Sequence, residues 1–212
     1  MFVAPKAPVP VFPLPGFVLY PGATVPLHVF EPRYRALVRD AALGDRWVAM
    51  ATLAPGWEED TQGRPAFLPL GCLGAIETLE WLPDDRYHLV LRGVIRVTFA
   101  RTDREYPYRT CEVDPEPGAP CDEGDPMTAM SRTSLLKARS RLLPLGPEAW
   151  VLPPEVDDDA PFEQLVGVIA QSLRAPLERR LEWLACDRLT DRARDMLRHM
   201  KKLSGETGEA GA

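Results

Sequence analysis

The chain has 212 residues, of which 25 are Lys or Arg and 31 are Asp or Glu, so its formal net charge is −6. At roughly 100 to 200 residues per domain, this length fits one domain or one domain with a satellite, and the 45% of hydrophobic residues suffices for a core. The acidic balance makes nucleic acid an unlikely partner, because binding to a phosphate backbone depends on many Lys and Arg side chains.

The first elements are short strands and one helix. Residues 9–30 place β-branched and aromatic stretches between prolines, which predicts edge or bulged strands joined by tight turns. Glu31 and Pro32 predict a helix start, because proline at the first helical position loses no hydrogen bond. Apolar residues follow at helical spacing as far as Ala41, and Gly44 suits a C-cap.

The following segments predict strands without intervening helices. Residues 47–53 form one strand, and residues 67–81 and 87–100 form two more, joined by a turn at 83–86. A further strand is predicted over 106–113. Several short strands in succession favour a small barrel or sandwich over βαβ units.

The composition changes after this β-rich part. Residues 8–113 are predicted to form a β-rich subdomain, and the acidic, proline-rich residues 114–126 a linker. Residues 127–203 read as a helical subdomain, because apolar residues recur at helical spacing between proline-marked starts. The small polar residues 204–212 are predicted to be a frayed tail.

The usual signatures of catalysis are missing from the sequence. It has no Walker A loop, no GxSxG elbow and no HExxH pair. Ser134 and Lys137 stand three residues apart on a predicted helix, but their arginine-rich surroundings favour a solvated surface. The four cysteines form no CxxC pair, and His28, His88 and His199 lie far apart in sequence. We therefore predict no enzyme, no metal site and no cofactor.

Nothing in the sequence predicts a membrane partner. No apolar run approaches the roughly 20 residues that span a bilayer, and the N-terminus is too rich in proline for a signal peptide. We expect a cytoplasmic protein whose four thiols are reduced.

Two blocks of the sequence resemble a known family, the LON substrate-binding domain, which is the N-terminal domain of Lon-type ATP-dependent proteases. The second block runs from Leu70 to Phe99 and includes Gly71, Arg92, Gly93 and Arg96. The resemblance covers residues 8–203, but the turn reads Asp84 and Asp85 where the family more often has Asp-Gly. The first block, from Val11 to Leu43, contains Phe12, Pro13, Leu14, Pro21, Gly22, Pro26, Leu27, His28, Phe30, Glu31, Pro32, Arg33 and Tyr34.

This resemblance implies both a fold and a function. The implied α+β fold is a PUA-like β pseudo-barrel with one embedded helix, followed by a C-terminal helical subdomain. The implied function is a stand-alone, non-catalytic module that binds unfolded polypeptide or exposed apolar segments, with a separate ATPase or protease as a further implied partner. Two alternatives remain open: an adaptor for a specific folded partner, and an RNA-binding protein, since PUA-like folds in other families bind RNA.

Candidate site residues follow from the aromatic and basic side chains. Trp57 and Trp150 stand in loop compositions, where exposed aromatic rings can anchor apolar peptides, and with Phe67 they form the predicted peptide-binding set. The basic residues of the last helix, from Arg188 to Lys202, favour a solvated face, and the alternative is a face that docks to an acidic partner or RNA. A structural role is expected for the signature residues Pro21, Gly22, Phe30, Glu31, Pro32, Arg33, Tyr34 and Gly93.

Overall fold

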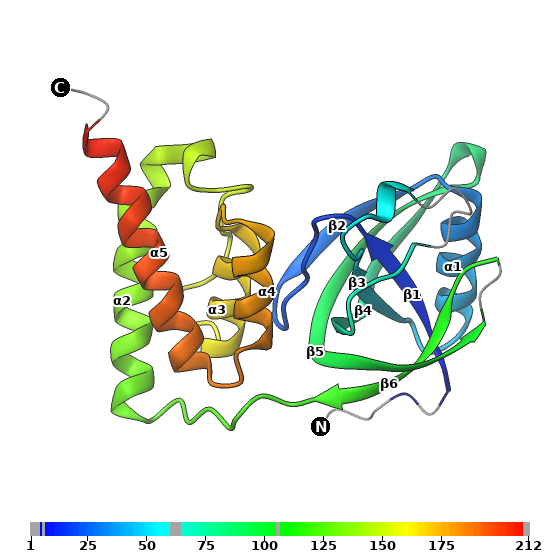
Figure 1. Ribbon diagram of the computed structural model, residues 1–212, viewed down its shortest axis with the longest axis horizontal. Coiled ribbons are helices and arrows are strands. Elements are labelled where there is room, and N and C mark those ends of the chain that lie inside the picture. The colour runs from blue at the N-terminus through cyan, green and yellow to red at the C-terminus, as the bar shows by residue number, and fades with distance from the viewer. Residues whose placement is uncertain (1–4, 6, 60–64, 105–106, 210–212) are drawn as a thin grey trace. The chain divides into compact units, whose positions relative to one another are not determined.

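The computed structural model describes residues 5, 7–59, 65–104 and 107–209. The chain divides into two compact units, unit 1 from Met1 to Pro117 and unit 2 from Gly118 to Ala212. Unit 1 contains the strands and the helix α1, and unit 2 is helical (Figure 1). The division between the units falls within the predicted linker at residues 114–126.

In the described residues, six strands of unit 1 form one sheet with the order β2-β5-β4-β3-β1-β6. The last strand, β6, pairs with β1 and also with the second half of the long β5, so the sheet curls back on itself. This is the predicted pseudo-barrel rather than a closed barrel: in the described residues β6 pairs with β1 only at Val9 and Pro10, and β2 forms an edge of the sheet beside β5. The strands are β1 (Val9–Leu14), β2 (Thr24–Val29), β3 (Trp47–Thr52), β4 (Leu70–Leu82), β5 (Arg86–Arg104) and β6 (Thr110–Glu116).

The predicted hairpin between β4 and β5 is present, and β2 pairs with β5 on the other side. Its turn is a short 3₁₀ helix, η2 (Pro83–Asp85), in which Asp84 and Asp85 adopt φ of 64° and 60°. Opposing residues on β2, β5 and β4 form three rows whose side chains point to one face, because side chains alternate along a strand. These rows are Val25–Leu91–Ile76, Leu27–Leu89–Leu79 and Val29–Tyr87–Trp81.

The helix α1 (Pro32–Leu43) has the predicted bounds and the predicted buried face. Glu31 is its N-cap residue, and the N–H of Gly44 donates to the carbonyls of Asp40 and Ala41 at its end. Its apolar face packs into the main core of unit 1 with Phe12, Leu89 and Leu91. The buried residues of α1 are Tyr34, Leu37, Val38 and Ala41.

The buried phenol of Tyr34 predicts a stability loss at alkaline pH. Burial raises the pKa of Tyr34 above its ordinary value of 10.0, because the tyrosinate would lose its hydration. Its contribution to the free energy of unfolding is therefore complete below the ordinary value and is lost as pH rises through the folded-state pKa. Ultraviolet titration of Tyr34→Phe should lack one late-ionising group, and loss of a group with an ordinary pKa would contradict this assignment.

The strand predicted at residues 106–113 is displaced to Thr110–Glu116 in β6. Tyr106 lies outside the described residues, and Tyr108 precedes the strand, 4% exposed, with its hydroxyl donating to Asp40 Oδ2 at 2.7 Å. The pairing of β6 with β5 continues to Glu116, opposite Arg96. The first three residues of the predicted linker are therefore strand, because β5 offers them a hydrogen-bonding partner that local composition does not reveal.

Unit 2 contains α2 (Pro126–Leu142), α3 (Phe162–Ser172), α4 (Leu177–Ala185) and α5 (Leu189–Glu209). Figure 1 shows α2 and α5 side by side, and they are the most extensively packed helix pair of the unit. Asp125 caps α2 by accepting the Thr128 N–H at 3.2 Å, as its N-cap position requires. The helix α5 continues through the predicted frayed tail to Glu209, and residues 210–212 lie outside the described chain.

Candidate peptide-binding surface

The two predicted aromatic anchors of unit 1 differ in accessibility. Trp57 begins the 3₁₀ helix η1 (Trp57–Glu59) and is 36% exposed. Phe67 is half-buried, because Phe99 packs edge-on against it with 4.9 Å between ring centroids. The Arg109 guanidinium lies 5.0 Å from the centroid of the Phe67 ring. Trp57 is therefore accessible to a ligand, whereas much of Phe67 is already used in packing.

The expectation that Trp150 stands exposed in a loop is wrong. Trp150 lies in unit 2, is 2% exposed, and its Nε1–H donates to the Leu142 carbonyl at 3.0 Å. The backbone beside it is also paired, since Val151 N–H donates to the Ser172 carbonyl at 2.7 Å. The prolines around Trp150 gave the segment a loop composition, but tertiary packing buries the indole.

Three residues of the family signature hold a close backbone approach. Gly93 in β5 lies against the backbone of Tyr20, where an added Cβ would come within 2.1 Å of the Tyr20 carbonyl oxygen. Gly22 adopts φ of 81°, and its N–H donates to the Gly93 carbonyl at 2.9 Å. Pro21, which joins these contacts, is buried. These contacts agree with the structural role expected for these residues.

The signature residues at the start of α1 also interact with one another. Arg33 Nε donates to Glu31 Oε2 at 3.0 Å, and the Arg33 guanidinium lies 4.6 Å from the centroid of the Tyr34 ring. Tyr34 stacks on Phe12 with 4.1 Å between ring centroids. Pro32 occupies the first turn of the helix. These contacts fix the path of the chain from β2 into α1.

Phe30, for which a structural role is expected, has a side chain that is 62% exposed. It follows β2 with the opposite parity to the buried Val29, so it lies on the outer face of the sheet. His28 packs near it at 5.9 Å between ring centroids, and His28 in turn packs against His88 of β5 at 4.8 Å. The alternation of inward and outward side chains along β2 predicts this exposure. The resemblance of the motif to the family signature does not.

Trp81 is the second exposed aromatic residue at this end of the sheet, and sequence reasoning treated it only as part of a strand. Its side chain is 73% exposed near the end of β4. The turn beyond it is held by Arg35 of α1, whose Nη1 donates to the Asp84 carbonyl at 3.1 Å. Trp81 has the parity of the buried Tyr87 and so lies on the core-facing side of the sheet, whereas His28, Phe30 and His88 lie on the outer face at the same end. We call His28, Phe30, Trp81 and His88 the aromatic end of unit 1.

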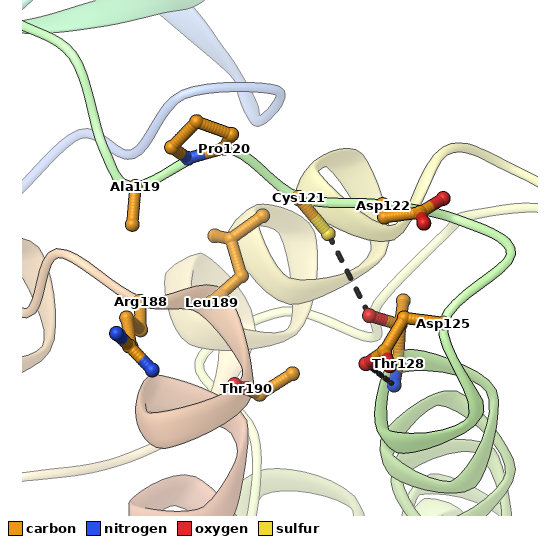
Figure 2. Close-up of a pocket in the computed structure, with 9 residues that line it drawn as sticks. All are labelled: Ala119, Pro120, Cys121, Asp122, Asp125, Thr128, Arg188, Leu189 and Thr190. Atoms are coloured by element: carbon orange, nitrogen blue, oxygen red, sulfur yellow. Dashed lines mark hydrogen bonds between the residues drawn. The ribbon is translucent and has the colours of Figure 1, made fainter.

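Unit 2 has a pocket of about 340 Å³. Figure 2 shows that it lies beside the N-terminal ends of α2 and α5, with Cys121, Asp125, Thr128 and Arg188 among its lining residues. Burial raises the pKa of the Cys121 thiol. A thiol with a raised pKa is a weak nucleophile, because the thiolate is the reactive form. The raised pKa therefore does not favour Cys121 as a nucleophile.

The structure places Ser134 and Lys137 on the helix α2. Ser134 Oγ donates to the Met130 carbonyl of the same helix at 2.8 Å, and Lys137 is exposed. Within the described residues, no group of three or more His, Cys, Asp or Glu side chains is placed to hold a metal ion. None of the helices in the same part of the chain is both long and apolar enough to cross a membrane.

Much of the basic character of α5 is neutralised inside unit 2. Arg194 pairs with Asp191 at 2.8 Å, and Arg198 pairs with Asp195 at 3.2 Å. Arg192 is 3% exposed and donates to the Cys186 carbonyl at 2.8 Å. These ion pairs agree with the solvated face that the sequence predicts for this helix.

Comparison with known proteins relates this architecture to Lon proteases. The chain is 27% identical over 170 residues to Lon protease 2 of Myxococcus xanthus, a match that covers 80% of this chain and 20% of the relative. It is 24% identical over 211 residues to Lon protease of Anaeromyxobacter dehalogenans, covering 96% of this chain and 25% of the relative. The chain thus spans about a fifth to a quarter of these relatives.

Solved structures show the same fold. The Lon N-terminal domain protein from Xanthomonas campestris is 28% identical with a TM-score of 0.61, over 90% of this chain and 97% of that one. The N-terminal domain of Mycobacterium avium complex Lon protease has a TM-score of 0.63 at 18% identity, over 94% of this chain and 98% of that one. The family model described as the ATP-dependent protease La (LON) substrate-binding domain matches residues 8–202. The chain belongs to the LON substrate-binding domain family.

Proposed function

We propose that this chain is a non-catalytic recognition module that binds apolar segments of unfolded polypeptides through the aromatic end of unit 1. The observation that carries this proposal is the exposure of Phe30 and Trp81, at 62% and 73%, in a member of a substrate-binding family. Large exposed aromatic side chains are costly to leave in water and bury much apolar area when a ligand covers them.

The composition of the aromatic end suits ligands of varied sequence. Aromatic rings contact apolar side chains through area and shape, so they require little sequence specificity. The imidazoles of His28 and His88 add polar groups that can bond a peptide backbone. In this proposal the protein acts in the cytoplasm and presents its ligands to a separate ATPase or protease.

Binding of an unfolded protein to a double variant of the aromatic end tests this function. We expect wild-type chain to bind reduced, carboxymethylated α-lactalbumin, and the Phe30→Ala and Trp81→Ala changes together to weaken this binding at least about tenfold. Fluorescence anisotropy of the labelled α-lactalbumin would measure the dissociation constants. The physical reason is the loss of the two largest exposed apolar side chains at this end of the sheet.

Leu43→Ala provides the matched control, because Leu43 is 84% exposed in unit 1 but lies at the far end of α1. It should bind as wild type does. Trp57→Ala tests whether the anchor predicted from the sequence also contributes. Absence of binding by the wild type, or equal losses in the Leu43 control and the aromatic variant, would contradict the proposal.

An adaptor for a folded partner is the second candidate. Leu143, Val151 and Leu152 of unit 2 are 43%, 55% and 60% exposed, which offers apolar area to a partner that holds this unit. Affinity capture from the native cytosol with wild type and with Val151→Ser/Leu152→Ser would distinguish the two. A single stoichiometric partner lost only in the unit 2 variant would favour the adaptor.

A further inference from the structure

The second half of β4 has an open edge. Residues Thr78–Leu82 pair with β5 on one side, and Glu77 lies at a register shift, whereas β3 pairs with β4 only as far as Ala75. The backbone of Arg46 adds one more bond, accepting the Ile76 N–H at 3.0 Å. Beyond Ile76, no other described strand pairs with β4 on this side. Alternate residues of an edge strand direct their N–H and C=O groups outward, where another strand can bond them.

The exposure of Trp81 indicates where an added strand would lie. In the row Val29–Tyr87–Trp81 the exposed fraction is 2% on β2, 9% on β5 and 73% on β4. Trp81 shares the core-facing side of the sheet with Tyr87, but it has no neighbouring strand beyond it. A strand added to β4 would place its own side chains next to Trp81 and Leu79 and would bury the indole.

The other open edge of the sheet is less suited to an added strand. In the described part of the chain, β2 pairs only with β5, and its central residue is Pro26. Proline lacks an N–H, and natural sheets use it to block pairing at an edge. The segment Glu77–Leu82 contains no proline. The edge of β4 is therefore better suited than the edge of β2 to pair with an added strand.

The charges along β4 indicate which strand would fit. Glu77 pairs with Arg92, whereas the Glu80 side chain is 71% exposed and lies 3.9 Å from the His88 Nδ1. Two copies of this chain that paired edge to edge would bring their exposed glutamates together, and like charges across strands are unfavourable. A Lys or Arg beside Glu80 would instead be favourable.

We propose that the edge of β4 binds an extended segment of an unfolded polypeptide as an additional strand, with an apolar residue beside Trp81 and a basic residue beside Glu80. This inference rests on the proposed function and specifies how the ligand is held. Main-chain hydrogen bonds supply affinity that does not depend on sequence, and the alternating side chains supply preference.

Backbone chemistry of a probe peptide tests the added strand. The probe is a fluorescein-labelled ten-residue peptide that alternates Val and Lys, made also with every Val N-methylated and with every Lys N-methylated. Only one edge of a bound strand faces β4, so one methylated peptide should lose at least about tenfold in affinity while the other keeps most of it. Amide hydrogen exchange of the chain, followed by NMR, should slow at outward-facing residues within 77–82 when the unmethylated peptide binds.

Matched variants test the charge preference. Glu80→Gln should weaken binding of the Val–Lys peptide severalfold but leave binding of a Val–Thr peptide unchanged. Glu112→Gln, which changes an exposed glutamate of β6, should affect neither peptide. Equal losses in both methylated peptides, or no change in exchange at 77–82, would overturn the proposal.

These experiments distinguish a failure of the added-strand proposal from a failure of the proposed function. If α-lactalbumin binds and depends on Phe30 and Trp81, but exchange at 77–82 is unchanged, only the added strand is wrong. If neither α-lactalbumin nor the peptide binds, the proposed function fails and the inference fails with it. Protection of 77–82 without peptide, together with a dimer in sedimentation, would identify a second copy as the occupant and overturn the proposal.

Discussion

Gly93→Ala is expected to destabilise unit 1 by about 3 kcal/mol or more, at the upper end of overpacking substitutions or beyond it. The added Cβ would lie 2.1 Å from the Tyr20 carbonyl oxygen and 2.8 Å from the Tyr20 carbonyl carbon. Both atoms are backbone, so no side-chain rotation can relieve the contact. Movement of the strand would also strain the bonds from Gly22 N–H to the Gly93 carbonyl and from Gly93 N–H to the Ala23 carbonyl.

Gly44→Ala is the matched control for this prediction. Gly44 has φ of −100°, and a Cβ there would meet its nearest atoms at ordinary van der Waals distances of 3.5 and 3.8 Å. Its free energy of unfolding should stay within roughly 1 kcal/mol of wild type. Urea unfolding followed by circular dichroism would measure both variants. A Gly93→Ala chain as stable as the Gly44→Ala chain would show that the segment before β2 can shift without cost.

Trp150→Ala is expected to destabilise unit 2 by about 3–5 kcal/mol, the usual cost of truncating a buried tryptophan. The side chain is 2% exposed, so its removal leaves a large cavity. The Leu142 carbonyl, which accepts the indole N–H at 3.0 Å, also loses its donor at the end of α2. The sequence had placed Trp150 in a binding site, and the structure changes the expected phenotype from weaker binding to lower stability.

Trp57→Ala is the control here, because Trp57 is 36% exposed and its truncation should change the free energy of unfolding by less than about 1 kcal/mol. Calorimetry of both variants would locate the loss, since unit 1 and unit 2 are separate compact units. In Trp150→Ala the transition assigned to unit 2 should move to lower temperature. An unchanged transition together with weakened peptide binding would restore the original interpretation.

Local sequence rules predicted the elements of unit 1 well where a residue's own backbone preference sets the end of a helix or a turn. Pro32 and Gly44 set the two ends of α1, and the apolar spacing between them identified its buried face. The acidic turn at 83–86 marked the hairpin of β4 and β5. The end of β6 could not be found this way, because the strand extends as far as β5 offers it hydrogen-bonding partners, up to Arg96 opposite Glu116, and local composition does not reveal that extent.

The candidate site was harder to predict, because the exposure of a side chain depends on which other segments of the chain pack around it. Phe30 belongs to a recognisable motif, but the motif does not reveal that the described elements leave the ring 62% exposed. Trp81 and Tyr87 oppose each other on adjacent strands with the same parity, yet one is 73% exposed and the other 9%. The difference arises because β5 has strands on both sides there, whereas β4 has one.

The composition, the net charge and the sequence motifs by themselves determined the class of this protein: an α+β chain of two parts whose sequence resembles a substrate-binding domain. Those features depend on residue type and on spacing along the chain, which are fully present in the sequence. Only the tertiary structure decided that Trp150 is buried, that Phe30 and Trp81 are exposed, and that β4 has an open edge. Each of these depends on which distant segment packs or pairs beside a residue, and that information arises only when the chain folds.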